Sequence, residues 1–568
     1  MSGLGRAPAV FRKHFPRAGP GGEGVSWTAS ATLTVMSRRA RGAYGDRNAT
    51  PGDTVPESPD LAGRAIPRGT RTMPAPREQA TLPGQDNPAT GVRRIQMYVG
   101  GRWIDSSASL FADVHNPATD QLIARTPLGG AADVDRAVAA ATKAYPTWRA
   151  TPPVNRVKFL FTLKNLLEKN FDDLARICTV EHGKTLDESR SSVRRTIDNV
   201  DLACGIPTLM QGRALEDIAA GIDCYTYRQP MGVFAAITPF NFPNMVPMWF
   251  LPHAIACGNT FIVKPSERVP LSQVRVFELL HEAGLPEGVV NLVHGAKEAV
   301  DAILDHPGIA GVSFVGSSPV AHYIYRRGAD KGKRVQALGG AKNFVLVMPD
   351  ADMDRAAQVS TESCFGCAGE RCLANSVVLG VGDAYETIAA KLVAEAKKIR
   401  VGDGLEPGVT MGPVISRAHR EKVLGYIEKG KAEGGRVVAG GSRADVGGKG
   451  WYVHPTVFDG VSPDATIARE EIFGPVLAVL PFDEPEEAVR IANASPYGLA
   501  AAVWTKDLKR GLTVARRLQA GTVWVNSYNS YDPALPFGGY KMSGFGRDQG
   551  AAALEGYTHV KSVWVDLR

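Results

Sequence analysis

GVFAAI at residues 232–237 is the first of five short hydrophobic runs from which the fold class of this chain is predicted. TFIVK follows at 260–264, VVNLVHG at 289–295, GVSFVG at 311–316 and FVLVM at 344–348. The segments between these runs, such as Leu271 to Ala283, have the composition of helices. Strands that alternate with helices indicate βαβ units, in which helices cover both faces of a parallel sheet. The sequence therefore predicts an α/β fold.

The ends of these runs suggest where a ligand binds. Ligands of parallel sheets lie beyond the carboxyl ends of the strands, and Lys264, Gly295 and Ser317 follow strand-like runs at that edge. A dinucleotide would lie there. The glycine-rich pattern GxGxxG is absent, and GSSPVA at 316–321 is a poorer phosphate-binding sequence, so the glycines alone support this site weakly.

Local patterns predict the first elements of the globular part. QMYVGGRWID at 96–105 indicates a hairpin that turns at Gly100 and Gly101. Asp133 is predicted to cap a helix with Val134 and Val138 on its apolar face. A second amphipathic helix is predicted from its apolar residues Val157, Leu160, Phe161 and Leu167.

FGCAGERCLA at 365–374 contains the strongest candidate for a nucleophile, Cys372. Gly366 and Gly369 leave the preceding backbone free to turn tightly, so that a small electrophile can approach the sulfur. Arg371 is expected to favour the thiolate, which is the reactive form of cysteine. On residue type alone, the alternative is a buried structural cysteine.

Five motifs in order resemble the aldehyde dehydrogenase superfamily over roughly residues 93 to 568. They are TPFNFP at 238–243, KPSE at 264–267, FVGS at 314–317, FGCAGERC at 365–372 and EEIFGPV at 470–476. The resemblance implies a Rossmann-type parallel-sheet NAD domain formed by residues 93–211 and 231–340, an α/β catalytic domain at 341–527 and a small β oligomerisation domain formed by 212–230 and 528–568. A homodimer or homotetramer is implied in the same way.

The resemblance also assigns roles to residues. It implies that Cys372 is the nucleophile and Asn241 the oxyanion donor. It implies that NAD is bound by Phe240, Lys264, Glu267, Ser317, Glu471 and Phe473. Lys264 and Glu267 would hold the adenosine ribose, and a carboxylate there favours NAD over NADP because it repels a 2′-phosphate. Ser317 would meet the pyrophosphate, and Glu471 with Phe473 would position the nicotinamide ribose and ring.

QALGGAKN at 336–343 departs from the superfamily pattern in a way that bears on the chemistry. Hydrolytic members carry a glutamate base where this chain has Ala337, and a methyl group cannot take a proton from water. A thioester on Cys372 would then wait for a thiol such as that of coenzyme A. QALGGAKN, YRQPMGV at 227–233 and the run through KPSERVP resemble methylmalonate semialdehyde dehydrogenases, whose carboxylate-bearing substrates would be bound by Arg195 and Arg371.

Other features leave alternatives open. Glu370 stands where the superfamily usually has glutamine, and LPFGGYKMSGFGRD at 535–548 resembles generic aldehyde dehydrogenases. A hydrolytic enzyme in which Glu370 or Glu471 is the base is therefore an alternative. A third possibility is a non-enzymatic binding protein, although a binding module needs no nucleophile.

Residues 1–92 differ from the rest in composition. They contain 11 Pro and 13 Gly and lack hydrophobic periodicity, which predicts a disordered extension. An arginine-rich start is also typical of mitochondrial transit peptides, so the matrix is an alternative to the expected cytoplasmic location, and Met73 is a possible true start. The net charge of +7 comes mostly from this segment, with twelve Arg and Lys against seven Asp and Glu, so no nucleic-acid partner is expected.

The seven scattered cysteines fit a reducing compartment. Cys364 and Cys367 form a CxxC pair without a second pair or nearby histidines, so no metal site is expected. No run of eighteen apolar residues occurs, so no membrane span is expected either. The predicted partner is a small aldehyde substrate.

Overall fold

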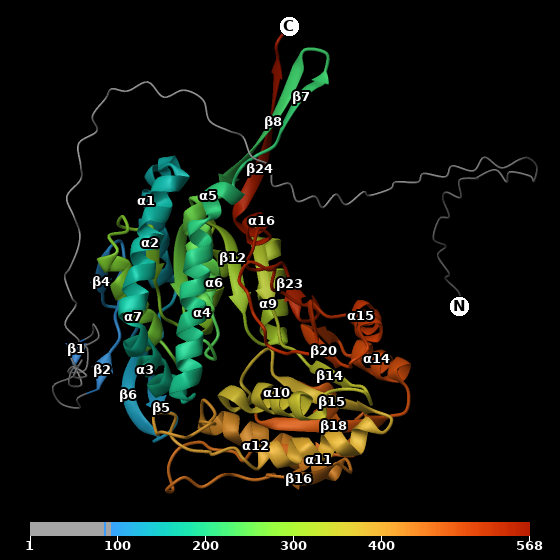
Figure 1. Cartoon of the computed structure of the whole chain (residues 1–568). Coiled ribbons are helices and arrows are strands. Elements are labelled where there is room, and N and C mark those ends of the chain that lie inside the picture. Colours follow the sequence, from blue (N-terminus) through green and yellow to red (C-terminus); the bar gives the residue numbers. More distant parts are fainter. Residues whose placement is uncertain (1–84, 87–91) are drawn as a thin grey trace, which may run out of the picture. The chain divides into compact units, whose positions relative to one another are not determined.

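The computed structural model describes residues 85–86 and 92–568 (Figure 1). The disorder predicted for residues 1–92 lies outside the described residues except at Gln85, Asp86 and Val92. Gln85–Asp86 forms strand β1, which pairs with β2 (Arg93–Arg94) in a four-stranded sheet. The other two strands of that sheet are β5 (Phe111–Asn116) and β6 (Gln121–Pro127).

An eight-stranded sheet contains most of the hydrophobic runs seen in the sequence, in the strand order β23-β13-β12-β9-β10-β11-β3-β4. Its strands are β3 (Met97–Val99), β4 (Arg102–Ile104), β9 (Val233–Ile237), β10 (Thr260–Lys264), β11 (Val290–Leu292), β12 (Ile309–Val315), β13 (Arg334–Leu338) and β23 (Gly544–Phe545). The five strands from β13 to β11 are parallel, and antiparallel strands close both edges. The predicted hairpin turning at Gly100 and Gly101 is confirmed as β3 and β4.

Four of the five predicted runs are neighbours in this sheet, but the fifth, FVLVM, is not. FVLVM belongs to β14 (Asn343–Val347) in a separate seven-stranded sheet, and RVQAL in β13 takes the fifth parallel position. The seven-stranded sheet has the order β16-β17-β18-β15-β14-β20-β21, and all its pairs except β16 with β17 are parallel. Its other strands are β15 (Asn375–Val381), β16 (Arg436–Ala439), β17 (Thr456–Asp459), β18 (Val476–Phe482), β20 (Ala500–Trp504) and β21 (Thr522–Val525).

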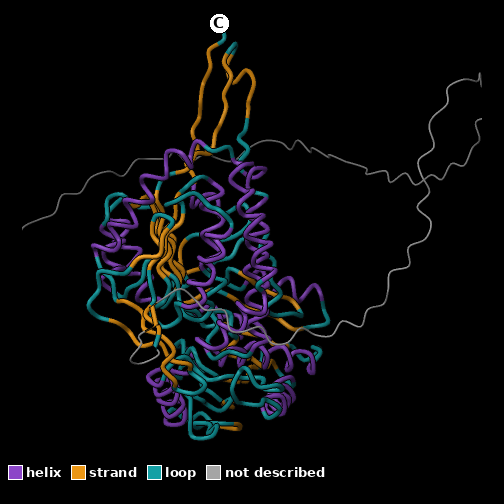
Figure 2. Tube along the Cα trace, turned by 90° about the vertical axis from the view of Figure 1, so that its left-hand side faces the viewer, coloured by secondary structure: helices purple, strands orange, loops and turns teal. Residues whose placement is uncertain are grey.

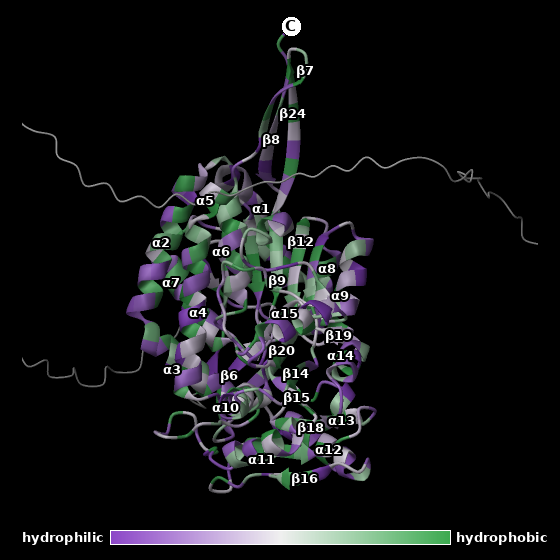
Figure 3. Ribbon diagram, turned by 45° about the vertical axis from the view of Figure 1, so that its right-hand side comes forward, coloured by the Kyte–Doolittle hydropathy of each residue, from purple (hydrophilic) through white to green (hydrophobic). Residues whose placement is uncertain are grey.

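Helices cover both faces of each large sheet, because residues along each central strand alternate between two cores. In β9, Val233 and Ala235 pack into one core while Phe234 and Ala236 pack into the other. Figure 3 shows hydrophobic residues on β9 and β12, with hydrophilic residues on the outer surfaces of the helices around them. The helices are α1 (Ala131–Ala150), α2 (Pro153–Lys169), α3 (Phe171–His182), α4 (Leu186–Cys204), α5 (Ile206–Leu209), α6 (Pro247–Cys257), α7 (Leu271–Glu282), α8 (Lys297–Asp305), α9 (Ser318–Asp330), α10 (Met353–Phe365), α11 (Ala384–Ala396), α12 (Arg417–Ala432), α13 (Thr466–Arg469), α14 (Pro485–Ala494), α15 (Leu508–Arg517) and α16 (Ala553–Tyr557).

The two predicted amphipathic helices are confirmed as α1 and α2, but one predicted detail of each is wrong. Helix α1 begins at Ala131 with Gly130 as its N-cap, so Asp133 is the third helical residue and its carboxylate instead accepts from Ser106 and Ser107. Phe161 in α2 is 49% exposed, and Leu163 lies on the buried face in its place.

A three-stranded antiparallel sheet projects from the helices around the eight-stranded sheet (Figures 1 and 2). It has the order β24-β8-β7 and consists of β7 (Ala214–Ala219), β8 (Ile222–Pro230) and β24 (Thr558–Asp566). A two-stranded sheet pairs β19 (Tyr497–Gly498) with β22 (Tyr540–Lys541). Residues 528–557 thus contribute short strands to two other sheets, and the predicted domain boundaries stay a prediction.

None of the helices in the described part of the chain is both long enough and apolar enough to cross a bilayer.

Candidate active site

The loop that carries Cys372, residues 366–374, joins α10 to β15. Cys367 and Ala368 each have a φ of 51°, and Gly369 has a φ of 74°, so three successive residues adopt the left-handed conformation. A Cβ on Gly369 would lie 2.2 Å from the carbonyl oxygen of Gly474, so only glycine fits there. Non-glycine residues in this conformation cost on the order of 1 to 3 kcal/mol each, and such strain gathers at functional sites.

Two polar side chains fix this loop. Asn343 donates from Nδ2 to the carbonyl oxygens of Cys372 and Ala374, both at 2.8 Å. Glu188 lies in the first turn of α4, where it completes a capping box with Thr185. Its Oε1 also accepts from the backbone N–H of Cys367 at 2.6 Å. The start of α4 and the turn before Cys372 are therefore held by one carboxylate.

Cys372 lines a cavity of about 180 Å³ together with both arginines that the resemblance assigned to the substrate. Arg195 comes from α4 and Arg371 from the Cys372 loop itself. Phe242, Trp249 and Phe537 also line this cavity. The structure thus brings a thiol, two guanidinium groups and apolar side chains together around one small space.

Arg371 attracts the Cys372 thiolate, as predicted, but its direct contacts are with other groups. Arg371 donates from Nη2 to Glu188 at 3.0 Å and from Nε to the sulfur of Cys367 at 3.2 Å. Burial, followed by the nearby Glu471 carboxylate, raises the pKa of the Cys372 thiol to about 12. The backbone N–H groups of Leu373 and Cys372 and the charges of the two arginines oppose this rise only in part. Without a ligand, Cys372 is therefore a protonated thiol.

A second, smaller cavity of about 20 Å³ lies against Cys372 and is lined by Glu471 and Phe473. Oε1 of Glu471 accepts from the backbone N–H of Ala341 at 2.9 Å, and burial raises the pKa of its carboxyl. Phe473 has a φ of 59°, and its ring makes an edge-to-face contact with Phe240 at 5.8 Å between centroids. Two of the residues assigned to NAD by the resemblance therefore line this cavity, and a third, Phe240, contacts one of them.

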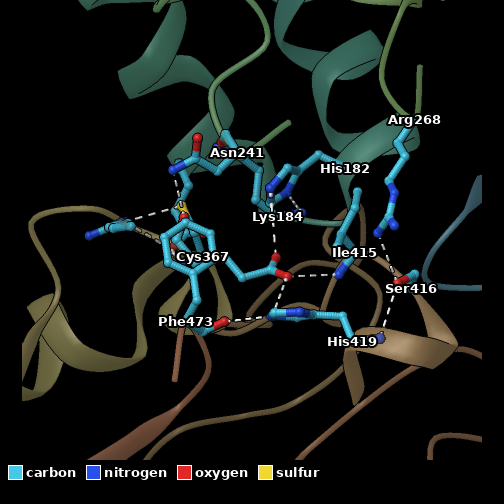
Figure 4. Close-up of polar contacts among 12 residues, drawn as sticks. His182, Lys184, Asn241, Arg268, Cys367, Ile415, Ser416, His419 and Phe473 are labelled. Atoms are coloured by element: carbon cyan, nitrogen blue, oxygen red, sulfur yellow. Dashed lines mark hydrogen bonds and ion pairs between the residues drawn. The ribbon is translucent and has the colours of Figure 1, made fainter. Parts of the chain in front are cut away.

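The carboxyl of Glu370 lies between His182 and His419, two histidines that Figure 4 shows facing the same buried space. Its Oε1 accepts from the backbone N–H of Ile415 at 3.0 Å and lies 3.4 Å from Nε2 of His419, while Oε2 lies 3.7 Å from Nε2 of His182. Burial raises the pKa of this carboxyl well above its usual range. The carboxyl lines neither of the two cavities beside Cys372, which disfavours Glu370 as a base for water at that sulfur.

Asn241 lies beside the Cys372 loop but lines neither cavity. Its side-chain Nδ2 donates to the backbone carbonyl of Glu370 at 2.9 Å, and the backbone carbonyl of Asn241 accepts from Nζ of Lys184 at 2.6 Å. The amide is therefore anchored to the residue two positions before Cys372. Its role as oxyanion donor stays a prediction.

The residues assigned to the adenosine half lie at the carboxyl edge of the eight-stranded sheet. Lys264 ends β10, and its Nζ donates to the carbonyls of Pro265 at 2.8 Å and Gly295 at 3.0 Å. Glu267 follows it and is partly exposed. Ser317 is the N-cap of α9, but its side chain makes no capping hydrogen bond, so the first N–H groups of this helix have no side-chain cap.

Ala337 is a buried residue of β13, and it lines a cavity of about 700 Å³ with Met542 and Phe545. Neither cavity beside Cys372 includes it. No carboxylate from this position can act on a thioester, because the side chain is a methyl group.

Sequence reasoning missed three residues of the site. Glu188 could have been found, because Thr185 and Glu188 have the spacing of a capping box. Asn343 lies in QALGGAKN, but nothing in the pattern ties an asparagine to carbonyls some thirty residues later. Tyr531, which lies under Arg195 with the guanidinium carbon 4.9 Å from the ring centroid, carries no motif at all.

Comparisons with known proteins show which family this chain resembles. The model of the aldehyde dehydrogenase family matches residues 103–563. Malonate-semialdehyde dehydrogenase 1 of Geobacillus thermodenitrificans strain NG80-2 is 45% identical over 478 residues, which cover 84% of this chain and 99% of that protein. The crystal structure of methylmalonate-semialdehyde dehydrogenase from Oceanimonas doudoroffii is similar with a TM-score of 0.82 and 41% identity, covering 84% of this chain and 98% of that one.

An NAD⁺ complex of aldehyde dehydrogenase from Bacillus cereus is similar with a TM-score of 0.81 and 39% identity, covering 84% of this chain and 97% of that one. These matches confirm the resemblance and the α/β fold predicted from the motifs. The chain therefore belongs to the aldehyde dehydrogenase family.

Proposed function

We propose that this chain is an NAD-dependent, CoA-acylating dehydrogenase that oxidises malonate or methylmalonate semialdehyde. The observation that carries the proposal is the cavity that Cys372 shares with Arg195 and Arg371. A thiol attacks the aldehyde carbon, and a guanidinium binds the carboxylate at the other end of the same small molecule. The names of relatives that are 41 to 45% identical agree with this substrate class.

Cys372 begins the reaction by giving up its thiol proton to solvent, and its sulfur then forms a bond to the aldehyde carbon, which leaves the oxygen as an alkoxide. Asn241 and the backbone N–H of Cys372 are proposed to donate to that oxygen, and each such donor is typically worth about 3 kcal/mol. Loss of hydride from the carbon then leaves a thioester on Cys372. NAD, when bound, supplies the hydride acceptor.

Coenzyme A is proposed to resolve the thioester, because Ala337 offers no base to activate water. The sulfur of coenzyme A bonds to the acyl carbon, and the sulfur of Cys372 leaves and takes up the proton that the coenzyme A thiol has lost. The carboxylate β to the thioester carbonyl departs as carbon dioxide, and the carbon it leaves takes a proton. The products are acetyl-CoA from malonate semialdehyde and propionyl-CoA from methylmalonate semialdehyde.

The residues at the sheet edge fit a dinucleotide. The N-terminus of α9 has no side-chain cap, and such a terminus favours a phosphate. Lys264 and Glu267 are proposed to hold the adenosine ribose, Ser317 the pyrophosphate, and Glu471 with Phe473 the nicotinamide ribose and ring. Phe240 supports Phe473 through the ring contact already described.

The enzyme is proposed to assemble as a homodimer or homotetramer in the cytoplasm. Within the described residues, β24 forms one edge of the three-stranded sheet, and Val560 and Trp564 on it are 54% and 63% exposed. An apolar edge strand of this kind suits pairing with a second copy. Sedimentation velocity of the full chain would measure the assembly, and a monomer at micromolar concentration would contradict it.

The test of the function is NADH formation from malonate semialdehyde, methylmalonate semialdehyde and propanal, each with and without coenzyme A. The proposal expects fast turnover of the two semialdehydes only with coenzyme A, and about one NADH per active site without it. Rapid multiple turnover to a free acid without coenzyme A would instead identify a hydrolytic enzyme.

A further inference from the structure

Lys184 is a fully buried lysine in the short turn between α3 and α4. The turn is fixed at both ends, because Gly183 closes α3 with a φ of 92° and the side chain of Thr185 caps α4. The side chain is 0% exposed and forms no ion pair within 4 Å in the described part of the chain. Burying a cation without a counter-ion costs free energy, so a residue of this kind needs an explanation.

Two contacts hold the ammonium of Lys184. Its Nζ donates to the backbone carbonyl of Asn241 at 2.6 Å and lies 4.0 Å from the centroid of the Phe242 ring (Figure 4). A hydrogen bond from a charged donor is roughly twice as strong as a neutral one, and the ring face adds a cation–π contact. Burial, and then the charge of Lys184, lower the pKa of His182 well below its usual range, so this neighbour stays neutral. The charge is therefore directed onto the backbone at Asn241.

The side chain of Asn241 is held from the other direction. Its Nδ2 carries two hydrogens, and one of them is donated to the backbone carbonyl of Glu370 at 2.9 Å, two residues before Cys372. The described residues give the second hydrogen no acceptor. An asparagine side chain has only two rotatable bonds, so the direction of this second N–H follows from where the backbone of Asn241 is held. Lys184 is the side chain that holds it.

We propose that Lys184 is the positioning residue of the oxyanion site. It fixes the backbone of Asn241 so that the second N–H of the amide points at the alkoxide formed from the aldehyde. Such a donor stabilises the alkoxide best when it is in place before the charge develops, which is why a rigidly mounted lysine suits the task. Lys184 touches no substrate, so its whole effect passes through Asn241. This inference rests on the proposed function, because it takes Asn241 as the oxyanion donor.

The first measurement is the rate constant of the NADH burst with malonate semialdehyde in the absence of coenzyme A, followed by stopped flow. Asn241→Ala should lower it about 10²- to 10³-fold through loss of one oxyanion donor. Lys184→Met, which removes the charge and the donor from a side chain of similar length, should lower it at least about tenfold, because a slightly misplaced donor loses much of its effect. The double variant should match Asn241→Ala within about threefold, since Lys184 then has nothing left to position.

The second measurement is the alkylation rate of Cys372 by iodoacetamide without NAD, followed by mass spectrometry of its peptide. Alkylation displaces iodide from carbon and forms no oxyanion, so Lys184→Met should leave its rate unchanged within about twofold. A displaced Cys372 loop would slow alkylation as well as the burst. Lys333→Met is the matched control, because Lys333 is also buried and its Nζ also donates to backbone carbonyls, those of His306 at 2.6 Å and Ile309 at 2.8 Å, outside the site. It should leave the burst rate unchanged.

Three results would overturn the inference while Asn241 keeps its role: an unchanged burst in Lys184→Met, losses that multiply in the double variant, or slowed alkylation in Lys184→Met. An unchanged burst in Asn241→Ala would instead overturn the oxyanion role within the proposed function. If Lys184→Met does not fold, Lys184→Gln keeps an N–H donor on a side chain one bond shorter, and the same comparison with Asn241→Ala decides the question.

Discussion

The thiol of Cys372 should react slowly with disulfide reagents until the solution is strongly alkaline. Burial is the main cause that raises its pKa to about 12, and the Glu471 carboxylate adds to the effect. A thiol with an ordinary pKa of about 8.5 is about one quarter ionised at pH 8, whereas Cys372 would be ionised to about one part in 10⁴. The thiolate is the reactive form, so the deficit in reactive species is on the order of 10³-fold.

Part of this deficit is recovered by the greater intrinsic nucleophilicity of a more basic thiolate. With a Brønsted coefficient of about 0.4 to 0.5, each ionised Cys372 reacts about 30-fold faster than an ordinary thiolate. The net expectation at pH 8 is a reaction on the order of 10²-fold slower than that of a free thiol.

The assay is the rate of mixed-disulfide formation at Cys372 with an aromatic disulfide, followed by mass spectrometry of the Cys372 peptide between pH 7 and 10 without NAD. Cys372→Ser supplies the background from the other cysteines. The logarithm of the rate should rise by about one for each pH unit over the whole range. A plateau below pH 9 would refute the reasoning, because it would place the pKa of the thiol at or below its ordinary range.

Three further predictions concern the surroundings of Cys372. Glu370→Gln should raise Tm more at pH 8 than at pH 5.5. Burial raises the pKa of the Glu370 carboxyl, so the folded state keeps a proton that the unfolded chain loses above pH ~4.3. Above that pH the native protein therefore loses up to about 1.4 kcal/mol of stability per pH unit, and the glutamine variant does not. Equal shifts in Tm at both pH values would contradict this. Gly366→Ala should lower kcat/KM for malonate semialdehyde, because the new Cβ would lie 2.4 Å from the guanidinium carbon of Arg371 and displace that group; an unchanged kcat/KM would count against it. Asn343→Ala should lower the urea midpoint, since two buried carbonyls lose their donor at about 1 to 3 kcal/mol each, and an unchanged midpoint would show that they find other partners.

The sequence predicted the sheets through their hydrophobic runs, and its errors have a physical cause. Strands that are buried on both faces look alike whichever sheet they join, so nothing in FVLVM at 344–348 distinguished it from the four runs before it. RVQAL in β13 was overlooked because Arg334 and Gln336 interrupt its hydrophobic pattern. Gln336 is buried because its amide donates to the carboxyl of Asp548, a contact between residues 212 positions apart.

The sequence predicted the reactive residues of the site but not the contacts that hold them. Motifs found Cys372, Arg195 and Arg371, which line one cavity. They could not tell that Glu188 pairs with Arg371, because 183 positions separate the two. Whether a charge is available to a substrate depends on such long-range pairs, which local patterns do not contain. The direction of Glu370, toward two histidines from distant helices, was hidden for the same reason.

The antiparallel pairing of β23 with β13 has a consequence for biosynthesis. Ala337 and Leu338 pair with Phe545 and Gly544, so the carboxyl-terminal part of this edge of the eight-stranded sheet is covered by residues that come much later in the sequence. A nascent chain therefore carries an open, hydrogen-bonding strand edge from the time β13 leaves the ribosome until residues 544–545 follow. The need for chaperones during translation should be greatest in that interval. A chain that stops before residue 544 would still contain Cys372, yet it would be prone to aggregate.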